Sequence, residues 1–119
     1  MERIMGAEIE RPLFTFRVLA EFDSEYNVYV ARCLETGSVA SADDMDTVLS
    51  MIEELLVDEV TFAIENDNLA NLYSSPAPLR TWEKYRTAIR GSVPAKPMQR
   101  EIRARDKEMP AEIQIASAA

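Results

Sequence analysis

Histidine is absent from the 119-residue chain, and cysteine occurs only once, as Cys33. Most zinc sites, serine and cysteine triads and imidazole general bases need histidine, so the chain lacks the residue on which they depend. A lone cysteine cannot form an internal disulfide, and the fold therefore does not require an oxidising compartment. Carboxylates with a hard cation such as Mg²⁺ are the catalytic chemistry that remains.

Long hydrophobic runs are also missing. No stretch of about 18 apolar residues occurs, so no segment is predicted to span a membrane. The N-terminal residues MERIMGAEIERP lack the basic region followed by an apolar stretch that is typical of a secretory signal peptide. We therefore expect one cytoplasmic domain over residues 1–119.

Positive charge is scarce in the first two thirds of the chain. Residues 1–78 hold 16 acidic and four basic side chains, whereas residues 79–107 hold nine basic and three acidic ones. The net charge of the whole chain is −8. An acidic body of this kind repels nucleic acid and attracts basic partners over about a Debye length, ~10 Å. The basic stretch is open to two interpretations, a nucleic-acid contact or docking against the acidic body.

Alternating residues in the first third of the chain predict an antiparallel meander of three strands. The first strand covers residues 13–22, and its apolar face consists of Phe14, Phe16, Val18, Ala20 and Phe22. Leu13 and Leu19 are apolar exceptions on the opposite face. A polar turn at residues 23–25 leads to a second strand over residues 26–34, and residues 38–42 can form a short third strand.

The pattern changes to a helical period at Met45 and keeps it until about Asn66. Asp43 and Asp44 are suited to cap the start of this helix, and Asp46 is favoured in its first turn. At about 1.5 Å per residue the helix is roughly 33 Å long, enough to cover one face of a small sheet. Its apolar stripe consists of Met45, Val48, Leu49, Ile52, Leu56, Val60 and Ala63.

The remainder of the chain completes an α+β fold with a β-β-β-α-(α)-β order. Residues 65–78 contain turn formers and two prolines and are expected to be a loop, and residues 79–90 predict a short helix with Trp82 and Tyr85 on one face. Residues 91–110 are expected to be a loop or loosely ordered insertion, with a weak helical signal in Gln99–Lys107. Residues 111–116 alternate again and predict a strand that returns to the sheet. The predicted core thus comprises residues 13–78 and 111–116.

The sequence resembles the HicB-like antitoxin family, whose domain has a truncated ribonuclease H-like fold. FTFRVLAEFDSEYNVYVARC is similar to the opening hairpin of the family, with Tyr29-Val30-Ala31 in place of its Tyr-Val-Ala step. SVASADDMDTVLSMIEELL resembles the third strand and the helix start, and ENDNLANLYSSPAP resembles the loop after the helix. The helix entry differs, because the family commonly has a Gly-Asp-Thr-like sequence where this chain has Ala42-Asp43-Asp44.

Two interpretations exist for the three aspartates at the helix start. A ribonuclease H-type site needs carboxylates from strands and helix to converge on two Mg²⁺ ions, but the first strand offers only Glu21 near its end. Capping and the helix dipole account for all three aspartates without a metal. We therefore predict no metal site, no catalytic residue and no cofactor. Cys33 is expected to be a small core residue, because no histidine can activate it.

Apolar residues also lie on both flanks of the predicted helix stripe, Met51 and Phe62 on one and Val57 and Ile64 on the other. The arc is wider than the ~100° that one sheet contact requires. Packing against the Trp82 helix or in a homodimer explains the flanks, and so does a face for a protein partner. If the second explanation holds, the candidate partner-binding residues, with Glu53 beside them, are Met51, Glu54, Leu55, Asp58 and Phe62.

The resemblance implies a non-catalytic antitoxin that binds and neutralises a small basic HicA-type toxin that cleaves mRNA. The alternatives are a stand-alone protein-binding or scaffold domain without a toxin partner and, less favoured, a metal-dependent nuclease. Many family members carry a C-terminal helix-turn-helix or ribbon-helix-helix module, but none is evident here, so direct DNA binding is not expected. Unpaired sheet edges and the flank residues favour a homodimer or a higher assembly.

Overall fold

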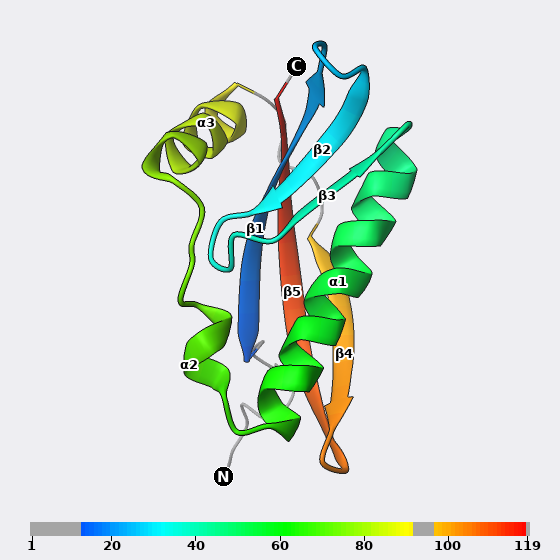
Figure 1. Ribbon diagram of the computed structural model, residues 1–119, viewed down its shortest axis with the longest axis vertical. Coiled ribbons are helices and arrows are strands. Elements are labelled where there is room, and N and C mark those ends of the chain that lie inside the picture. Colours follow the sequence, from blue (N-terminus) through cyan, green and yellow to red (C-terminus); the bar gives the residue numbers. More distant parts are fainter. Residues whose placement is uncertain (1–12, 92–96, 119) are drawn as a thin grey trace, which may run out of the picture.

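Within the residues that the structure describes, the fold combines one mixed sheet with three helices, which confirms the α+β class (Figure 1). The computed structural model describes residues 13–91 and 97–118. The strands are β1 (Phe14–Asp23), β2 (Val28–Cys33), β3 (Val39–Ala42), β4 (Met98–Ala104) and β5 (Lys107–Ala118). The helices are α1 (Met45–Glu65), α2 (Leu69–Leu72) and α3 (Leu79–Arg90).

The strands are arranged in the order β3-β2-β1-β5-β4. The first three form the predicted antiparallel meander, with Val18 opposite Cys33. The last strand, β5, returns to the middle of the sheet and pairs in parallel with β1, with Phe14 opposite Ala111 (Figure 1). The expected returning strand is therefore confirmed, although it is longer than residues 111–116.

The main core lies between α1 and one face of the sheet. Asp44 caps α1, because its Oδ1 accepts a hydrogen bond of 2.8 Å from the main-chain N–H of Thr47. The predicted stripe of α1 is buried at Val48, Ile52, Leu56, Val60 and Ala63. These side chains cover Phe14, Phe16 and Val18 of β1 together with Ile102 and Ile113 of the last two strands.

A second, smaller core lies on the opposite face of the sheet, beneath α3. Leu19, Leu34, Tyr85 and Ala116 meet there, which explains why Leu19 interrupts the alternation of β1. Trp82 is half-buried, its indole N–H donates to the carbonyl of Ala77 at 3.2 Å, and the guanidinium of Arg17 lies 5.7 Å from its ring centroid. The aromatic face of the basic helix therefore docks within the chain.

Phe22 lies on the predicted face of β1, but the expectation that it is buried there is wrong. Its side chain is 45% exposed, and its ring meets Tyr29 edge to face with centroids 5.1 Å apart. The buried stripe of α1 begins at Val48, and the β1–β2 hairpin extends past the helix (Figure 1). Periodicity assigned Phe22 to the correct strand, but the helix does not extend far enough to bury it.

The expectation of a loop over residues 91–110 is also wrong in its second half. Residues 98–104 form β4, and Arg105 and Asp106 connect it to β5 in a two-residue turn with φ values of 52° and 60°. Both central residues have the positive φ of a type I′ hairpin. The weak helical signal over Gln99–Lys107 is not realised, because Ile102 and Ala104 alternate into the core. Residues 92–96 lie outside the described residues.

Candidate functional site

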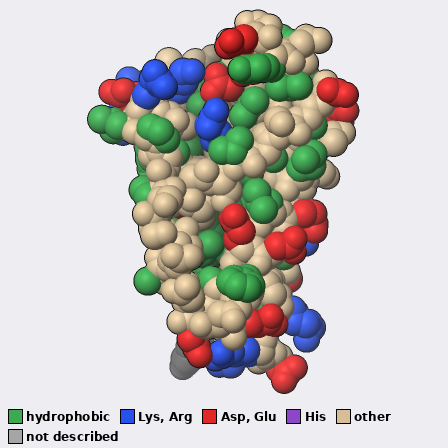
Figure 2. Space-filling model, viewed as in Figure 1, with side chains coloured by type: hydrophobic (Ala, Val, Ile, Leu, Met, Phe, Trp, Pro, Cys, Tyr) green, Lys and Arg blue, Asp and Glu red, His purple; other side chains and the backbone are tan. Residues whose placement is uncertain are grey.

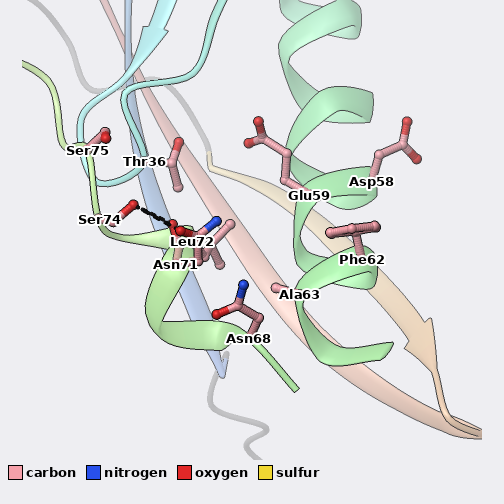
Figure 3. A pocket seen from close by; sticks show the side chains of 10 residues that line it. All are labelled: Thr36, Asp58, Glu59, Phe62, Ala63, Asn68, Asn71, Leu72, Ser74 and Ser75. Carbon is pink, nitrogen blue, oxygen red and sulfur yellow. Dashed lines mark hydrogen bonds between the residues drawn. The ribbon is translucent and has the colours of Figure 1, made fainter. Parts of the chain in front are cut away.

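A pocket of about 540 Å³ opens between α1 and the segment that follows it (Figure 3). The C-terminal half of α1 forms one side, and residues from Asn68 to Ser75 form the other. Asn68 directs its amide into the space between the two sides. The hydroxyl of Ser74 donates a hydrogen bond to the main-chain carbonyl of Asn71 on the same side of the pocket. The full lining consists of Thr36, Asp58, Glu59, Phe62, Ala63, Asn68, Asn71, Leu72, Ser74 and Ser75.

The second wall of the pocket is positioned by contacts with the β2–β3 turn. Gly37 has a φ of +77°, and a Cβ built there would lie only 2.0 Å from the carbonyl oxygen of Ser75. Two residues after Ser75, the main-chain N–H of Ala77 donates a hydrogen bond of 2.9 Å to the carbonyl of Leu34. Leu72 is buried against the main core, and Tyr73 stacks at 6.5 Å from Phe16. The wall is therefore fixed to the sheet at several points.

The structure brings together two of the predicted partner-binding residues at the pocket, Asp58 and Phe62. Phe62 is 65% exposed, an unusual exposure for a large apolar side chain on a helix that covers a core. Met51 is 45% exposed, and Leu55 is half-buried. Because Met51, Leu55, Asp58 and Phe62 are spaced by four, three and four residues, they follow one side of α1 up to the pocket.

Glu54 does not belong to this group. Its Oε1 accepts a hydrogen bond of 2.9 Å from Arg100 of β4, and Glu53 accepts another from the same guanidinium at 2.5 Å. These two carboxylates raise the pKa of Arg100, which keeps the pair ionised. Glu54 therefore shares one cation with Glu53 on the side of α1 that faces β4, and the three groups together keep a net charge of −1.

Two more carboxylates near the pocket are engaged within the chain, and one of them, Asp67, is paired with a cation. Glu59 accepts a hydrogen bond of 2.5 Å from the hydroxyl of Ser38, and Asp67 pairs with Arg105 at 3.0 Å, which lowers the pKa of Asp67. Asp58, in contrast, is exposed and has no ionic partner among residues 13–91 and 97–118. Asp58 is therefore the carboxylate at the pocket that is free to meet a basic group.

Charged side chains of both signs are spread over the molecule. In the view of Figure 2, one group of Lys and Arg side chains lies over α3 and another at the lower end of the molecule, and acidic side chains lie along α1 among apolar ones. Lys84 of α3 contacts Glu21 of β1 at 3.4 Å, so part of the basic helix is matched by the acidic body. The face that carries the pocket thus combines acidic and apolar groups.

The remaining candidate groups are not arranged as a reactive centre in the part of the chain that the structure describes. Cys33 is buried, and burial raises the pKa of its thiol to about 11, so the nucleophilic thiolate is scarce at neutral pH. Asp44 is engaged as the helix cap, and Asp43 and Asp46 are exposed. No three carboxylate or thiol groups of the described residues are gathered in a way that would suit a metal ion.

Sequence reasoning missed most of the pocket. Thr36, Glu59 and the four polar residues from Asn68 to Ser75 were not singled out, because their side chains meet only when the chain folds back after α1. One signal was present in the sequence: Leu69 and Leu72 share the spacing of a helix turn inside the stretch expected to be a loop. Among the helices that the structure describes, none has the length and apolar content needed to cross a membrane.

Comparisons with protein-family models, with curated proteins and with solved structures each find no match to the chain. The resemblance to HicB-like antitoxins therefore stays a prediction from the sequence. The assignment of the pocket and of the neighbouring face of α1 as a candidate site depends only on the contacts and exposed fractions of the described residues.

Proposed function

We propose that the chain is a non-catalytic, antitoxin-like protein that binds a small basic protein through α1 and the pocket beside it. One observation carries the proposal. An exposed aromatic ring, Phe62, and a carboxylate without an ionic partner in the described residues, Asp58, both line the same pocket. A ring of this kind gives an interface an apolar anchor, and the carboxylate steers a basic partner and orients it.

The pocket supplies what a peptide segment requires. The amides of Asn68 and Asn71 can both donate and accept hydrogen bonds, and the hydroxyls of Thr36 and Ser75 can do the same. Ala63 and Leu72 give it an apolar lining. A lysine or arginine of the partner would therefore find a carboxylate, amide oxygens and an aromatic face within one site.

The resemblance to HicB-like antitoxins supplies the identity of the partner, a HicA-type toxin that cleaves mRNA. In this proposal the chain covers the RNA-binding face of the toxin and competes with RNA for the same basic residues. The chain would act in the cytoplasm, where the mRNA is located and where a single reduced cysteine is usual.

A stand-alone protein-binding domain is the second candidate, and one observation favours it. Glu53, Glu54, Asp67 and Glu59 are already engaged within the chain. Arg100 and Arg105 offset two of these four charges, so this side of the molecule is less negative than its carboxylates alone imply. A binding site that relies on amides and an aromatic ring suits peptides of many compositions.

Co-expression with the product of the neighbouring reading frame, followed by co-purification and an mRNA-cleavage assay, tests the proposal. The expected result is a complex in which cleavage by the partner is suppressed. The double variant Asp58→Lys/Phe62→Ala should weaken the complex by about 30-fold or more, since truncating a central anchor costs roughly 2 kcal/mol.

The matched control is Glu25→Lys/Tyr26→Ala. It makes the same kinds of change in the exposed β1–β2 turn, where Tyr26 is 70% exposed, and should leave the complex intact. Binding without any RNA cleavage by the partner would favour the stand-alone domain. Equal binding by both double variants would refute the site.

A further inference from the structure

The outer edge of β4 is the longest open strand edge in the described part of the chain. The sheet ends at β3 on one side and at β4 on the other, and β3 has only four residues whereas β4 has seven. An open edge presents main-chain N–H and C=O groups that can pair with a further strand. The edge of β4 does not depend on the pocket, so any role of this edge is independent of the proposed function.

The hairpin geometry determines which residues of β4 offer these groups. Ala104 and Lys107 flank the two-residue turn, and a flanking pair of this type exchanges its hydrogen bonds within the hairpin. Because such pairs alternate along the ladder, Arg100 and Ile102 also direct their main-chain groups to β5. The carbonyl of Pro110, opposite Glu101, accepts from Leu13 on the β1 side at 2.9 Å, as this alternation requires.

The outward main-chain groups of β4 therefore belong to Gln99, Glu101 and Arg103. Their side chains are exposed and share one face of the sheet, while Ile102 and Ala104 point into the core on the other face. Glu101 has no ionic partner among residues 13–91 and 97–118. Arg103 contacts Glu108, but a guanidinium has five N–H donors and can serve a second carboxylate.

The order of charges along the outer edge of β4, Glu101 followed by Arg103, is complementary to that of a second antiparallel copy. If two copies of β4 pair antiparallel about a two-fold axis at Ile102, Glu101 of each copy lies opposite Arg103 of the other. The register also makes Glu101 and Arg103 a hydrogen-bonded pair, in agreement with the outward direction of their main-chain groups. A shift of the axis by one residue would place Glu101 opposite Glu101 or Arg103 opposite Arg103, and like charges in that position are destabilising.

We propose that β4 is a homodimer interface, at which two copies of the chain join their sheets through an antiparallel β4–β4 pair centred on Ile102. The interface contributes main-chain hydrogen bonds together with two Glu101–Arg103 pairs. Helix α1 contacts β4, and its apolar side chains Val57 and Ile64 are only half-buried in the single copy. The joined sheet would comprise both copies, and each copy would keep its pocket free.

Sedimentation velocity of the full chain over a wide range of concentrations tests the proposal first. The monomer mass is 13.4 kDa, and the expected species at high concentration has twice that mass. Glu101→Arg should raise the dissociation constant of the dimer about tenfold, and Arg103→Glu should do the same, since each reverses two cross-strand pairs.

Mixing the two variants tests the proposed register most directly. Glu101→Arg and Arg103→Glu each set like charges opposite one another in their own dimers, but a mixed dimer would pair two arginines with two glutamates. A heterodimer at low ionic strength from two variants that self-associate poorly would support the register. Glu101→Pro should abolish dimerisation and leave the fold intact, as judged by circular dichroism, because the lost N–H points out of the sheet.

A wild-type chain that stays monomeric at all concentrations would overturn the proposal, and so would a dimer that is insensitive to all three substitutions. If the chain is monomeric alone but Glu101→Pro prevents capture of the basic partner, the edge belongs to that partner and the second copy is excluded. If the Asp58→Lys/Phe62→Ala variant loses the basic partner but still dimerises like the wild type, the pocket and the β4 interface are independent, and the dimer proposal is supported.

Discussion

Gly37 is the residue at which a single methyl group should have the largest effect on the pocket wall. Gly37→Ala forces alanine into the left-handed region at φ +77°, which costs about 1 kcal/mol or more. The new Cβ would also lie 2.0 Å from the carbonyl oxygen of Ser75, so the main chain on one side must move. That movement would lengthen or break the hydrogen bond from Ala77 to Leu34, which contributes about 1 kcal/mol to stability. We expect a loss of roughly 2–4 kcal/mol in the free energy of unfolding.

Urea unfolding followed by circular dichroism measures this loss, and Gly91→Ala is the matched control. Gly91 has a negative φ of −94°, and the nearest atom to its added Cβ is 3.7 Å away. Alanine there should change the stability by about 0.5 kcal/mol or less. Gly37→Asn separates the two causes, because asparagine tolerates the left-handed region but keeps the clash. An unfolding midpoint of Gly37→Ala equal to that of the wild type would refute the reasoning.

Two further predictions concern titratable groups. Hydrogen bonds from Thr47 hold the pKa of Asp44 below its ordinary value, so the cap stabilises the fold above about pH 4 and loses its effect as the pH falls through the depressed pKa. The gap in thermal midpoint between the wild type and Asp44→Ala should thus be present at pH 7 and should close in acid; a constant gap would contradict the role of the charge. The buried thiol of Cys33, with its pKa raised to about 11, should react with a thiol reagent at pH 8 only after unfolding in urea. Rapid labelling of the native chain would show that the site is open.

Local periodicity was sufficient for most of the main core. The alternation of β1 and the helical stripe of α1 both report which side of an element is apolar, and the structure buries Phe16 against Leu56 and its neighbours accordingly. The prediction failed at Phe22, because a strand pattern carries no information on how far a covering helix extends. Leu19 looked irregular for a related reason: it belongs to a second core that only α3 reveals.

β4 and the pocket could not be predicted from local patterns. β4 contains four charged or amide side chains in seven residues, and its apolar content is too low to indicate a strand. Its stability comes from pairing with β5 and from the ion pairs of Arg100 with the acidic turn of α1. The pocket brings Thr36 close to Asn68 and Phe62, and this proximity depends on the close approach of Gly37 to Ser75.

The parallel ladder between β1 and β5 has a consequence for how the protein is made. Phe14 pairs with Ala111, so the two strands at the centre of the sheet come from nearly opposite ends of the described sequence. During translation the meander and α1 leave the ribosome first, with one side of β1 lacking its neighbour until β5 has emerged. Contacts this distant in sequence slow folding, and an unpaired strand beside Phe14 and Phe16 favours aggregation in the interval. Newly made chains should therefore depend on chaperones more than the small size of the protein suggests.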